Sequence, residues 1–330
     1  MLAGWKKKSN LSSNEVSTAV WIQQLRLCCR KRSSGFWMTR QRKQFGMRYL
    51  KVESEVFEYN AWDNVEWSLE QEEEARNKIA NQKDSPVASQ EAECLLRNPA
   101  EQWNTFYQTH KNKFFMDRNW LLTEFPELDV KCRESDDPLL VLDVGCGVGN
   151  ATIPLLQTSE QSGKMFVYAC DYSQQAVDIL KQTTSQWSDR CKPFLWDITG
   201  QITETIPPRS LDILLCIYVL SALPPEKQQQ AVINLTSLLK PGGALLLKDY
   251  AQFDMTQLRF KKNRLIDENF YRRGDGTLVY FFTQKELDRL FNGVGLKQET
   301  NVLDRRLIVN RAKRVKMYRM WVQCKYVKNV

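Results

Sequence analysis

The sequence predicts an α/β fold built on a mostly parallel β-sheet, and two observations carry the prediction. The apolar run 139–144 ends in a glycine-rich stretch, 145–149, and continues into residues 151–156. This order indicates a buried strand, a tight loop and a helix, the first unit of a nucleotide-binding sheet. Later apolar runs of strand length also end in carboxylates. Together they predict a sheet whose strand ends form one binding site.

Four more strands of this sheet are expected after the loop, at residues 164–171, 191–197, 211–220 and 244–250. The turn Lys240-Pro-Gly-Gly243 separates a helix from the last of them. Asp171 and Asp197 end the first two. Because parallel strands place their carboxyl ends at one edge of the sheet, these side chains are expected to lie near the glycine loop.

The glycine loop favours S-adenosylmethionine over a dinucleotide. Gly145, Gly147 and Gly149 carry no Cβ, so a cofactor can lie against the backbone where the helix begins. A dinucleotide fingerprint would place its third glycine at position 150, where this chain has Asn150. Gly145 and Gly147 are therefore candidate cofactor contacts.

Residues at the strand ends complete the candidate cofactor site. Asp171 lies a little over 20 residues past the loop, where a carboxylate grips ribose hydroxyls. Asp197 is placed to accept a hydrogen bond from the adenine amino group, with Ile198 and Ile217 on opposite ring faces. One such aspartate alone would more simply be a solvated strand end. Their ordered combination with the loop favours the cofactor site.

Length and composition are those of a globular protein with a substantial core. The chain has 330 residues and no apolar stretch near the roughly 18 residues of a membrane span, so no membrane attachment is expected. Its nine cysteines form no C-x-x-C pair, and His110 is its only histidine. Neither a metal site nor a disulfide framework is expected, and a reducing compartment fits.

Charge is distributed unevenly along the chain. Residues 1–50 contain eleven Lys and Arg against one Glu, a net +10, so the rest of the chain carries −2 of the total of +8. An insertion at 254–276 places cations beside aromatic residues, which suits phosphates and unstacked bases, and the chain beyond Asp304 is purely basic. Merely solvated charge is the alternative. The candidate RNA contacts are Arg259, Lys261, Lys262, Arg272, Arg305 and Arg306.

Three regions are expected. Residues 1–40 are Ser- and Arg-rich with little acid, which is typical of a mitochondrial presequence and equally of a disordered basic arm. Residues 41–137 form an N-terminal helical and aromatic extension, with an exposed helix at 68–82. Residues 138–330 form the sheet domain with its basic insertion. They also contain a strand at 277–282, a helix at 284–291 capped by Thr283, and a last strand at 320–326.

One helix of the extension precedes the first strand closely. Trp103, Phe106, Tyr107 and His110 recur at helical spacing and share one face. Core packing is the usual reason for such a stripe. A helix at this place can also close over the cofactor pocket, so an aromatic lid that includes Trp103 and Tyr107 is the competing interpretation.

Several motifs outside the cofactor loop resemble the methyltransferase-like tRNA N3-methylcytidine methyltransferases. They span about residues 42–328, and the threonine/arginine type of the cytosol is the most similar. The motifs are Trp-x-x-Phe-Tyr-x-x-His-x-x-x-Phe-Phe-x-Asp-Arg-x-Trp from Trp103, Gly-Cys-Gly-Val-Gly-Asn from Gly145, Leu-Arg-Phe-Lys-Lys from Leu258, Asn-Phe-Tyr-x-Arg-Gly-Asp-Gly-Thr from Asn269, and Asp-Arg-Arg-Leu-x-Val-Asn from Asp304.

The resemblance implies a class I, Rossmann-like methyltransferase fold with a seven-stranded sheet, S-adenosylmethionine as methyl donor, and cytidine 32 of the tRNA anticodon loop as substrate. It implies cofactor contacts from Trp103, Tyr107, Gly145, Asp171, Asp197, Ile198 and Ile217. The chain departs from the family pattern at Asp143, where relatives carry Glu, and at Pro224-Pro225, where several carry His-Pro. The first change is conservative, and the second weakens any assignment near that loop.

The expected reaction needs little from the protein beyond positioning. Cytosine N3 carries an in-plane lone pair and can attack a sulfonium methyl without losing a proton, so no strong general base is required. The base must be splayed out of its stack, which an anticodon loop permits. Asp249 and Tyr250, at the end of the strand 244–250, are the candidates for holding the cytosine, with ordinary strand-end roles as the alternative.

Other functions remain open from the sequence. The same fold serves methyltransferases of proteins and small molecules, and a non-catalytic RNA-binding subunit is the second alternative. A helper protein, such as a tRNA-binding adaptor or an aminoacyl-tRNA synthetase, would be a further partner. The cytoplasm is the expected location, with the mitochondrial matrix as the alternative that the basic N-terminus leaves open.

Overall fold

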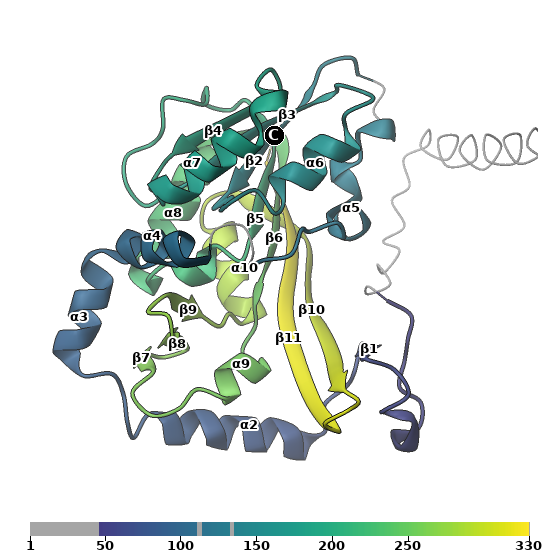
Figure 1. Ribbon diagram of the computed structural model, residues 1–330, viewed down its shortest axis with the longest axis vertical. Coiled ribbons are helices and arrows are strands. Elements are labelled where there is room, and N and C mark those ends of the chain that lie inside the picture. Colours follow the sequence, from purple (N-terminus) through teal and green to yellow (C-terminus); the bar gives the residue numbers. More distant parts are fainter. Residues whose placement is uncertain (1–45, 111–113, 133–134, 330) are drawn as a thin grey trace, which may run out of the picture. The chain divides into compact units, whose positions relative to one another are not determined.

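The computed structural model describes residues 46–110, 114–132 and 135–329. The expected basic arm at 1–40 lies outside the described residues. Residues 44–330 form one compact unit, whose α/β organisation confirms the expected fold class. Figure 1 shows its central sheet with helices on both faces.

The central sheet has eight strands in the order β1-β10-β11-β6-β5-β2-β3-β4. The five strands from β4 to β6 are parallel, and β11, β10 and β1 continue the sheet in antiparallel fashion. The strands are β1 (Ala61–Asp63), β2 (Leu139–Val144), β3 (Met165–Asp171), β4 (Cys191–Leu195), β5 (Leu211–Ile217), β6 (Leu239–Tyr250), β10 (Leu296–Asn310) and β11 (Val315–Lys328).

The resemblance implies a seven-stranded sheet, whereas the central sheet has eight strands, and the two that the sequence analysis did not foresee are β10 and the short edge strand β1. It pairs with β10 from Ala61↔Ile308 to Asp63↔Arg306, and Trp62 between them is 3% exposed. Three residues bounded by Asn60 and Asn64 carry too little periodicity to indicate a strand. Besides this backbone pairing, the apolar packing of Trp62 against Val56, Leu307 and Val309 holds the segment on the sheet.

Both faces of the parallel strands are buried, which explains their nearly continuous apolar sequences. In β2 and β5, Val141 and Ile213 pack on one side, against the core that includes helix residue Leu155, while Leu142 and Leu214 pack on the other. Alternating side chains therefore serve two separate cores. The helices are α2 (Leu69–Gln82), α3 (Ser89–Arg97), α4 (Pro99–His110), α5 (Leu121–Glu124), α6 (Thr152–Thr158), α7 (Gln174–Thr183), α8 (Pro225–Leu238), α9 (Met255–Leu258) and α10 (Gln284–Asn292).

Local signals for two helices are confirmed by their caps. Ser68 accepts from the Gln71 N–H at the start of α2, and the Gln71 side chain accepts in return. Thr283 and Glu286 make the same reciprocal pair at the start of α10. Each box satisfies backbone donors that the first helical turn leaves without partners.

The insertion after β6 folds as a small antiparallel sheet of its own. It consists of β7 (Leu265–Asp267), β8 (Phe270–Arg272) and β9 (Leu278–Tyr280), of which the sequence predicted only the last. Its apolar side packs tightly, with the rings of Phe260 and Tyr271 stacked 4.8 Å apart. Helix α2 is fastened to it, because Gln82 donates to the carbonyls of Gln257 and Phe260.

Candidate functional site

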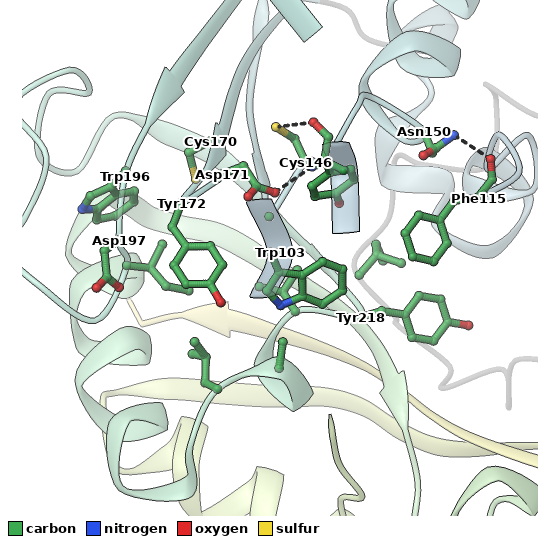
Figure 2. Close-up of a pocket in the computed structure, with 18 of the residues that line it drawn as sticks. Trp103, Phe115, Cys146, Asn150, Cys170, Asp171, Tyr172, Trp196, Asp197 and Tyr218 are labelled. Carbon is green, nitrogen blue, oxygen red and sulfur yellow. Dashed lines mark hydrogen bonds between the residues drawn. The ribbon is translucent and has the colours of Figure 1, made fainter. Parts of the chain in front are cut away.

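One cavity opens at the carboxyl ends of β2, β3 and β5. From this point β2, β3 and β4 follow one another toward one edge of the sheet, and β5 and β6 follow one another in the opposite direction. Ligands of open α/β sheets bind at this kind of switch point. With its open mouth the cavity encloses about 750 Å³. Figure 2 shows Trp196 and Asp197 at one end, Phe115 and Tyr218 at the other, and Trp103 between them.

All eight residues that the sequence predicts at the cofactor line this cavity. Helix α4 of the extension contributes two of them, the glycine loop two, and the ends of β3, β4 and β5 the others. They are Trp103, Tyr107, Gly145, Gly147, Asp171, Asp197, Ile198 and Ile217. Residues from five separate segments of the chain therefore converge on one space.

The glycine loop leaves room that any side chain would fill. Gly145 and Gly147 both have positive φ, 57° and 55°, in the left-handed region that glycine adopts without strain. A Cβ at Gly147 would lie 2.5 Å from Tyr107 Oη, and one at Gly145 would lie 2.6 Å from Val219. Substitution at either position would therefore strain the backbone and crowd the cavity wall.

Asp171 ends β3 and is fixed by the backbone around it. The N–H of Gly147 donates to Oδ2 and the N–H of Ser173 to Oδ1, both at 2.9 Å. Burial raises the pKa of this carboxyl to about 6, although these hydrogen bonds oppose the shift. Each carboxylate oxygen has a second lone pair, so Asp171 can also accept from ligand hydroxyls.

The adjoining wall combines one exposed carboxylate with apolar side chains. Asp197 Oδ1 accepts from the N–H and the hydroxyl of Thr199, at 2.9 and 2.8 Å. Ile198, which follows β4, is 6% exposed, and Ile217, which ends β5, is 1% exposed. Trp196, which the sequence analysis missed, also lines this wall. A flat ring with one amino group suits such a lining.

Helix α4 covers the cavity with the aromatic stripe predicted from the sequence. Trp103 lies 5.9 Å from Tyr107, ring to ring, and Phe106 packs edge-on against both. The two interpretations of this stripe turn out to be compatible. Phe106 and Tyr107 belong to a buried cluster with Val148, and Trp103 and Tyr107 also line the cavity.

The segment between α4 and α5 supplies residues that the sequence analysis did not assign. Arg118 lines the cavity, donates to the Ile217 carbonyl at 3.1 Å, and holds its guanidinium 5.4 Å from the Tyr218 ring centroid. Asn150 fastens this segment to the loop by donating to the Phe115 carbonyl and to Asp117. The Asp-Arg of the family motif was the signal that could have identified Arg118.

Tyr218 follows β5 in a left-handed backbone conformation, with φ 60°. A non-glycine residue pays about 1 kcal/mol or more for this conformation, which persists where the surroundings impose it. Its ring lines the cavity and packs 5.1 Å from that of Tyr250, over which Arg273 lies at 5.2 Å. Tyr250, one of the two predicted cytosine-holding residues, therefore does not line the cavity itself but packs against Tyr218, which does.

Asp249, the other predicted cytosine-holding residue, has a different position. It is 0% exposed, does not line the cavity, and accepts from the backbone N–H groups of Ser221 and Tyr250 at 3.0 and 2.8 Å. Burial raises its pKa to about 6. Asp249 is therefore placed to fix the turn after β5, and contact with a substrate base is corrected to this supporting position.

The predicted RNA contacts divide into exposed and internally paired cations. Arg259, Lys261 and Lys262 are exposed on the insertion. Arg272 pairs with Glu91 of α3, and the Arg305 Nε is buried without a hydrogen-bond partner among the described residues.

For Arg306, the prediction of an RNA contact is corrected, because its guanidinium pairs with carboxylates of the protein. Its Nε donates to Asp304 at 2.9 Å, its Nη2 lies 3.4 Å from Glu124, and its side chain is 26% exposed. Because Asp304 and Glu124 neutralise its charge, Arg306 stabilises the sheet.

The acids around Arg306 belong to a buried charge cluster. Lys248 of β6 lies 2.7 Å from both Glu124 and Asp304. Burial alone would raise the pKa of Asp304, but Lys248 and Arg306 outweigh it and hold that pKa below its usual range. The cluster joins the extension to β6 and β10, so removing one member would leave a buried charge without compensation.

Two kinds of feature are absent from the described residues. No group of three or more His, Cys, Asp or Glu side chains is arranged to hold a metal ion there. In the same part of the chain, no helix has the length and apolar character to cross a membrane.

Comparisons with known proteins agree with this site. Residues 142–245 match the family model described as a methyltransferase domain. The tRNA N(3)-cytidine methyltransferase METTL2 of Danio rerio is 46% identical over 319 residues, covering 87% of this chain and 90% of that protein. Human METTL2B is 40% identical over 357 residues, covering 87% and 94%.

A yeast relative has a more specific name. The tRNA(Thr) (cytosine(32)-N(3))-methyltransferase of Saccharomyces cerevisiae is 41% identical over 283 residues, covering 85% of this chain and 45% of that protein. Among solved structures, the 1,6-didemethyltoxoflavin-N1-methyltransferase of Burkholderia thailandensis has a TM-score of 0.48 and 16% identity, covering 74% and 93%. On the identity and coverage of the METTL2 proteins, the chain belongs to the tRNA N(3)-cytidine methyltransferase family.

Proposed function

We propose that this chain is an S-adenosylmethionine-dependent methyltransferase that forms N3-methylcytidine at position 32 of the tRNA anticodon loop, in threonine tRNA, arginine tRNA or both. The observation that carries the proposal is the convergence of all eight expected cofactor residues on one cavity, in a chain of this family. The yeast relative, whose name specifies position 32 and threonine tRNA, supports the choice of site and substrate.

The residues of the cavity fit the proposed cofactor. Asp171 would accept from the ribose hydroxyls and Asp197 from the adenine amino group, with Ile198 and Ile217 against the ring. Arg118 is the cation on the cavity wall and would bind the carboxylate of the methionyl group. The aromatic face of Trp103 then covers the site from α4.

S-adenosylmethionine supplies a methyl group on a positively charged sulfur. Cytosine N3 presents a lone pair in the ring plane, so the attacking atom needs orientation more than activation. The protein's contribution is then to hold the base and to exclude water. Tyr107 lines the cavity as a neutral side chain, because burial and the nearby Asp171 raise the pKa of its phenol.

The cytosine is proposed to enter at the Tyr218 end of the cavity. Tyr218 and Tyr250 offer aromatic surface there, and Arg273 extends it toward the basic insertion. Base stacking on aromatic and guanidinium planes is the usual way to hold a splayed nucleotide. Tyr250 remains our candidate for positioning the base, through its packing against Tyr218.

The decisive experiment is nucleoside mass spectrometry of tRNA incubated with the purified chain and methyl-labelled cofactor. We expect labelled N3-methylcytidine in threonine or arginine tRNA, and none when cytidine 32 is replaced by uridine. Label on another nucleoside, or on added protein or small molecules alone, would refute the proposal. Failure to bind the cofactor by calorimetry would favour a non-catalytic RNA-binding subunit.

The same assay decides the role of a helper. Activity of the purified chain on unmodified and fully modified tRNA, compared with its activity in a cell extract, shows whether a tRNA-binding adaptor or an aminoacyl-tRNA synthetase is required. An extract that restores an otherwise absent activity would support a helper protein as a further partner.

We propose the cytoplasm as the location, because the resemblance to the cytosolic type extends over most of the chain. The competing signal is the basic composition of residues 1–40. A fluorescent protein fused to residues 1–45 should stay in the cytosol. Import of that fusion into mitochondria, with a shortened N-terminus, would contradict the proposal.

A further inference from the structure

The hairpin of β10 and β11 is longer than the sheet to which it belongs. Its strands have 15 and 14 residues, and β11 pairs with β6 only from Trp321↔Tyr250 to Val327↔Ala244. The six residues of β11 before Trp321 extend the hairpin roughly 20 Å past the end of β6, at about 3.3 Å per residue. Figure 1 shows this projection, with β1 beside its far end.

The direction of the projection follows from topology. Strands β2, β3, β5 and β6 are parallel, and the cavity lies at their carboxyl ends. Because β11 is antiparallel to β6, the turn between β10 and β11 lies beyond that same edge. The end of the hairpin therefore extends from the face of the sheet that carries the site.

Three cations at the turn, Arg311, Lys313 and Arg314, form what we call the tip cations. All three are exposed, and no described carboxylate forms an ion pair with any of them. They differ in this from the two cations that follow them on β11. Lys316 pairs with Glu53, and Arg319 pairs with Asp254 at 2.8 Å.

The turn holds the tip cations in place by contacts that leave their charges available. Arg311 Nε donates to the Phe57 carbonyl at 3.1 Å, and the Arg314 guanidinium lies 4.3 Å from the Phe57 ring centroid. The N–H of Lys313 donates to Asn310 Oδ1, which shapes the turn. A fixed row of uncompensated cations suits a regularly charged polyanion better than a single acidic side chain.

Resting on the proposed function, we propose that the tip cations, which lie roughly 20 Å beyond the end of β6, bind backbone phosphates of the anticodon stem. The loop nucleotide occupies the cavity, and the helical stem above it presents phosphates at that distance. At about 3 Å per base pair, a projection of this length covers the whole of an anticodon stem of about five pairs, so the contact falls at the end of the stem away from the loop. These contacts position the RNA and read no sequence.

The test compares two variants and two RNAs. The tip variant is R311Q/K313Q/R314Q. The matched control, K181Q/K192Q/K285Q, removes the same charge at exposed positions on α7, β4 and α10. The RNAs are full-length tRNA and a stem-loop closed by about three pairs, which reaches only about 10 Å from the loop. Affinity is measured from 50 to 300 mM salt.

The tip variant is expected to bind full-length tRNA about tenfold more weakly at 0.1 M salt. Its slope of log affinity against log salt should flatten by two to three units, about 0.9 per lost contact. The control variant should bind like the wild type, and the short stem-loop should not distinguish the variants. Because Arg311 and Arg314 contact Phe57, the single variant K313E, which keeps those contacts, should weaken tRNA binding in the same direction.

Unchanged tRNA affinity and salt slope in both tip variants would overturn the inference. The tip cations would then be expected to bind an acidic partner other than tRNA. Equal weakening of the short stem-loop would place the contact at the loop and would also overturn it. The proposed function is tested separately by wild-type methylation. A wild-type chain that modifies cytidine 32 while the tip variant binds normally refutes the hairpin contact alone.

Discussion

The two ends of the cavity are built in different ways. At the β3 and β4 end, carboxylates are locked by backbone donors, as Asp171 is by Gly147 and Ser173. At the β5 end, aromatic and cationic planes such as Tyr218 and Arg118 meet, and the Tyr218 hydroxyl forms no hydrogen bond with any described residue. A rigid end suits a ligand of fixed shape, whereas an adaptable aromatic end suits a base that must be drawn out of an RNA.

The comparison predicts its largest effect at the rigid end. Asp171→Ala should reduce cofactor affinity roughly 10- to 150-fold or more, because the ribose hydroxyls lose a charged acceptor worth roughly 1.5 to 3 kcal/mol and the Gly147 N–H also loses its partner. Calorimetry with S-adenosylmethionine measures the effect. Tyr250→Leu, at the other end, is the control and should bind the cofactor normally. Unchanged affinity in Asp171→Ala would disprove the rigid end as the ribose site.

The adaptable end should respond in turnover with RNA. Tyr250→Leu keeps apolar contact with Tyr218 but removes the aromatic plane beneath Arg273. We expect kcat/KM for tRNA to fall roughly 5- to 150-fold, as for loss of one stacking interaction of about 1 to 3 kcal/mol. Tyr250→Phe should retain most activity. If Leu and Phe behave alike, the ring is not used by the base.

The two ends should also differ in their response to pH. The pKa of Asp171 is raised to about 6, so this group loses its charge as pH falls through 6. Cofactor affinity should decline below that pH, approaching tenfold per unit, because the neutral acid is a poorer acceptor. Calorimetry from pH 5 to 8 measures the decline, and Asp171→Asn should abolish it. An affinity constant down to pH 5 would contradict the assignment.

The smallest effect is expected outside the cavity. Changing Arg259, Lys261 and Lys262 of the insertion to Ala should weaken tRNA binding several-fold and flatten the salt slope by about one unit per lost contact. Cofactor affinity should stay the same, since these exposed residues do not line the cavity. A wild-type salt slope in this variant would move the RNA path away from the insertion.

The rigid end was predictable from sequence because each of its residues adjoins a strand end that local patterning reveals. Asp171 and Asp197 follow apolar runs, and Gly147 stands in a recognisable loop. The adaptable end depends on contacts between distant segments. Arg118 reaches Ile217 across 99 residues of sequence, and hydropathy carries no signal of that distance.

The charged residues show the same limit. Arg306 and Lys313 look equivalent in the basic C-terminal sequence, but β10 places Arg306 among Asp304 and Glu124 while the turn leaves Lys313 exposed. Counting charges predicts that a polyanion binds somewhere on this part of the chain. Which cations remain available depends on the pairing of strands that the sequence analysis partly missed, because β10 was not foreseen.

The pairing of β1 with β10 also has a consequence for synthesis of the chain. Ala61 emerges from the ribosome 245 residues before Arg306, which lies in its partner strand. At about 5 to 20 residues per second, this interval is roughly 12 to 50 s. During that time Trp62, which the folded chain buries almost completely, has no strand to cover it. The nascent chain therefore leaves the Trp62 side chain without this cover, and open to chaperones, until β10 is made.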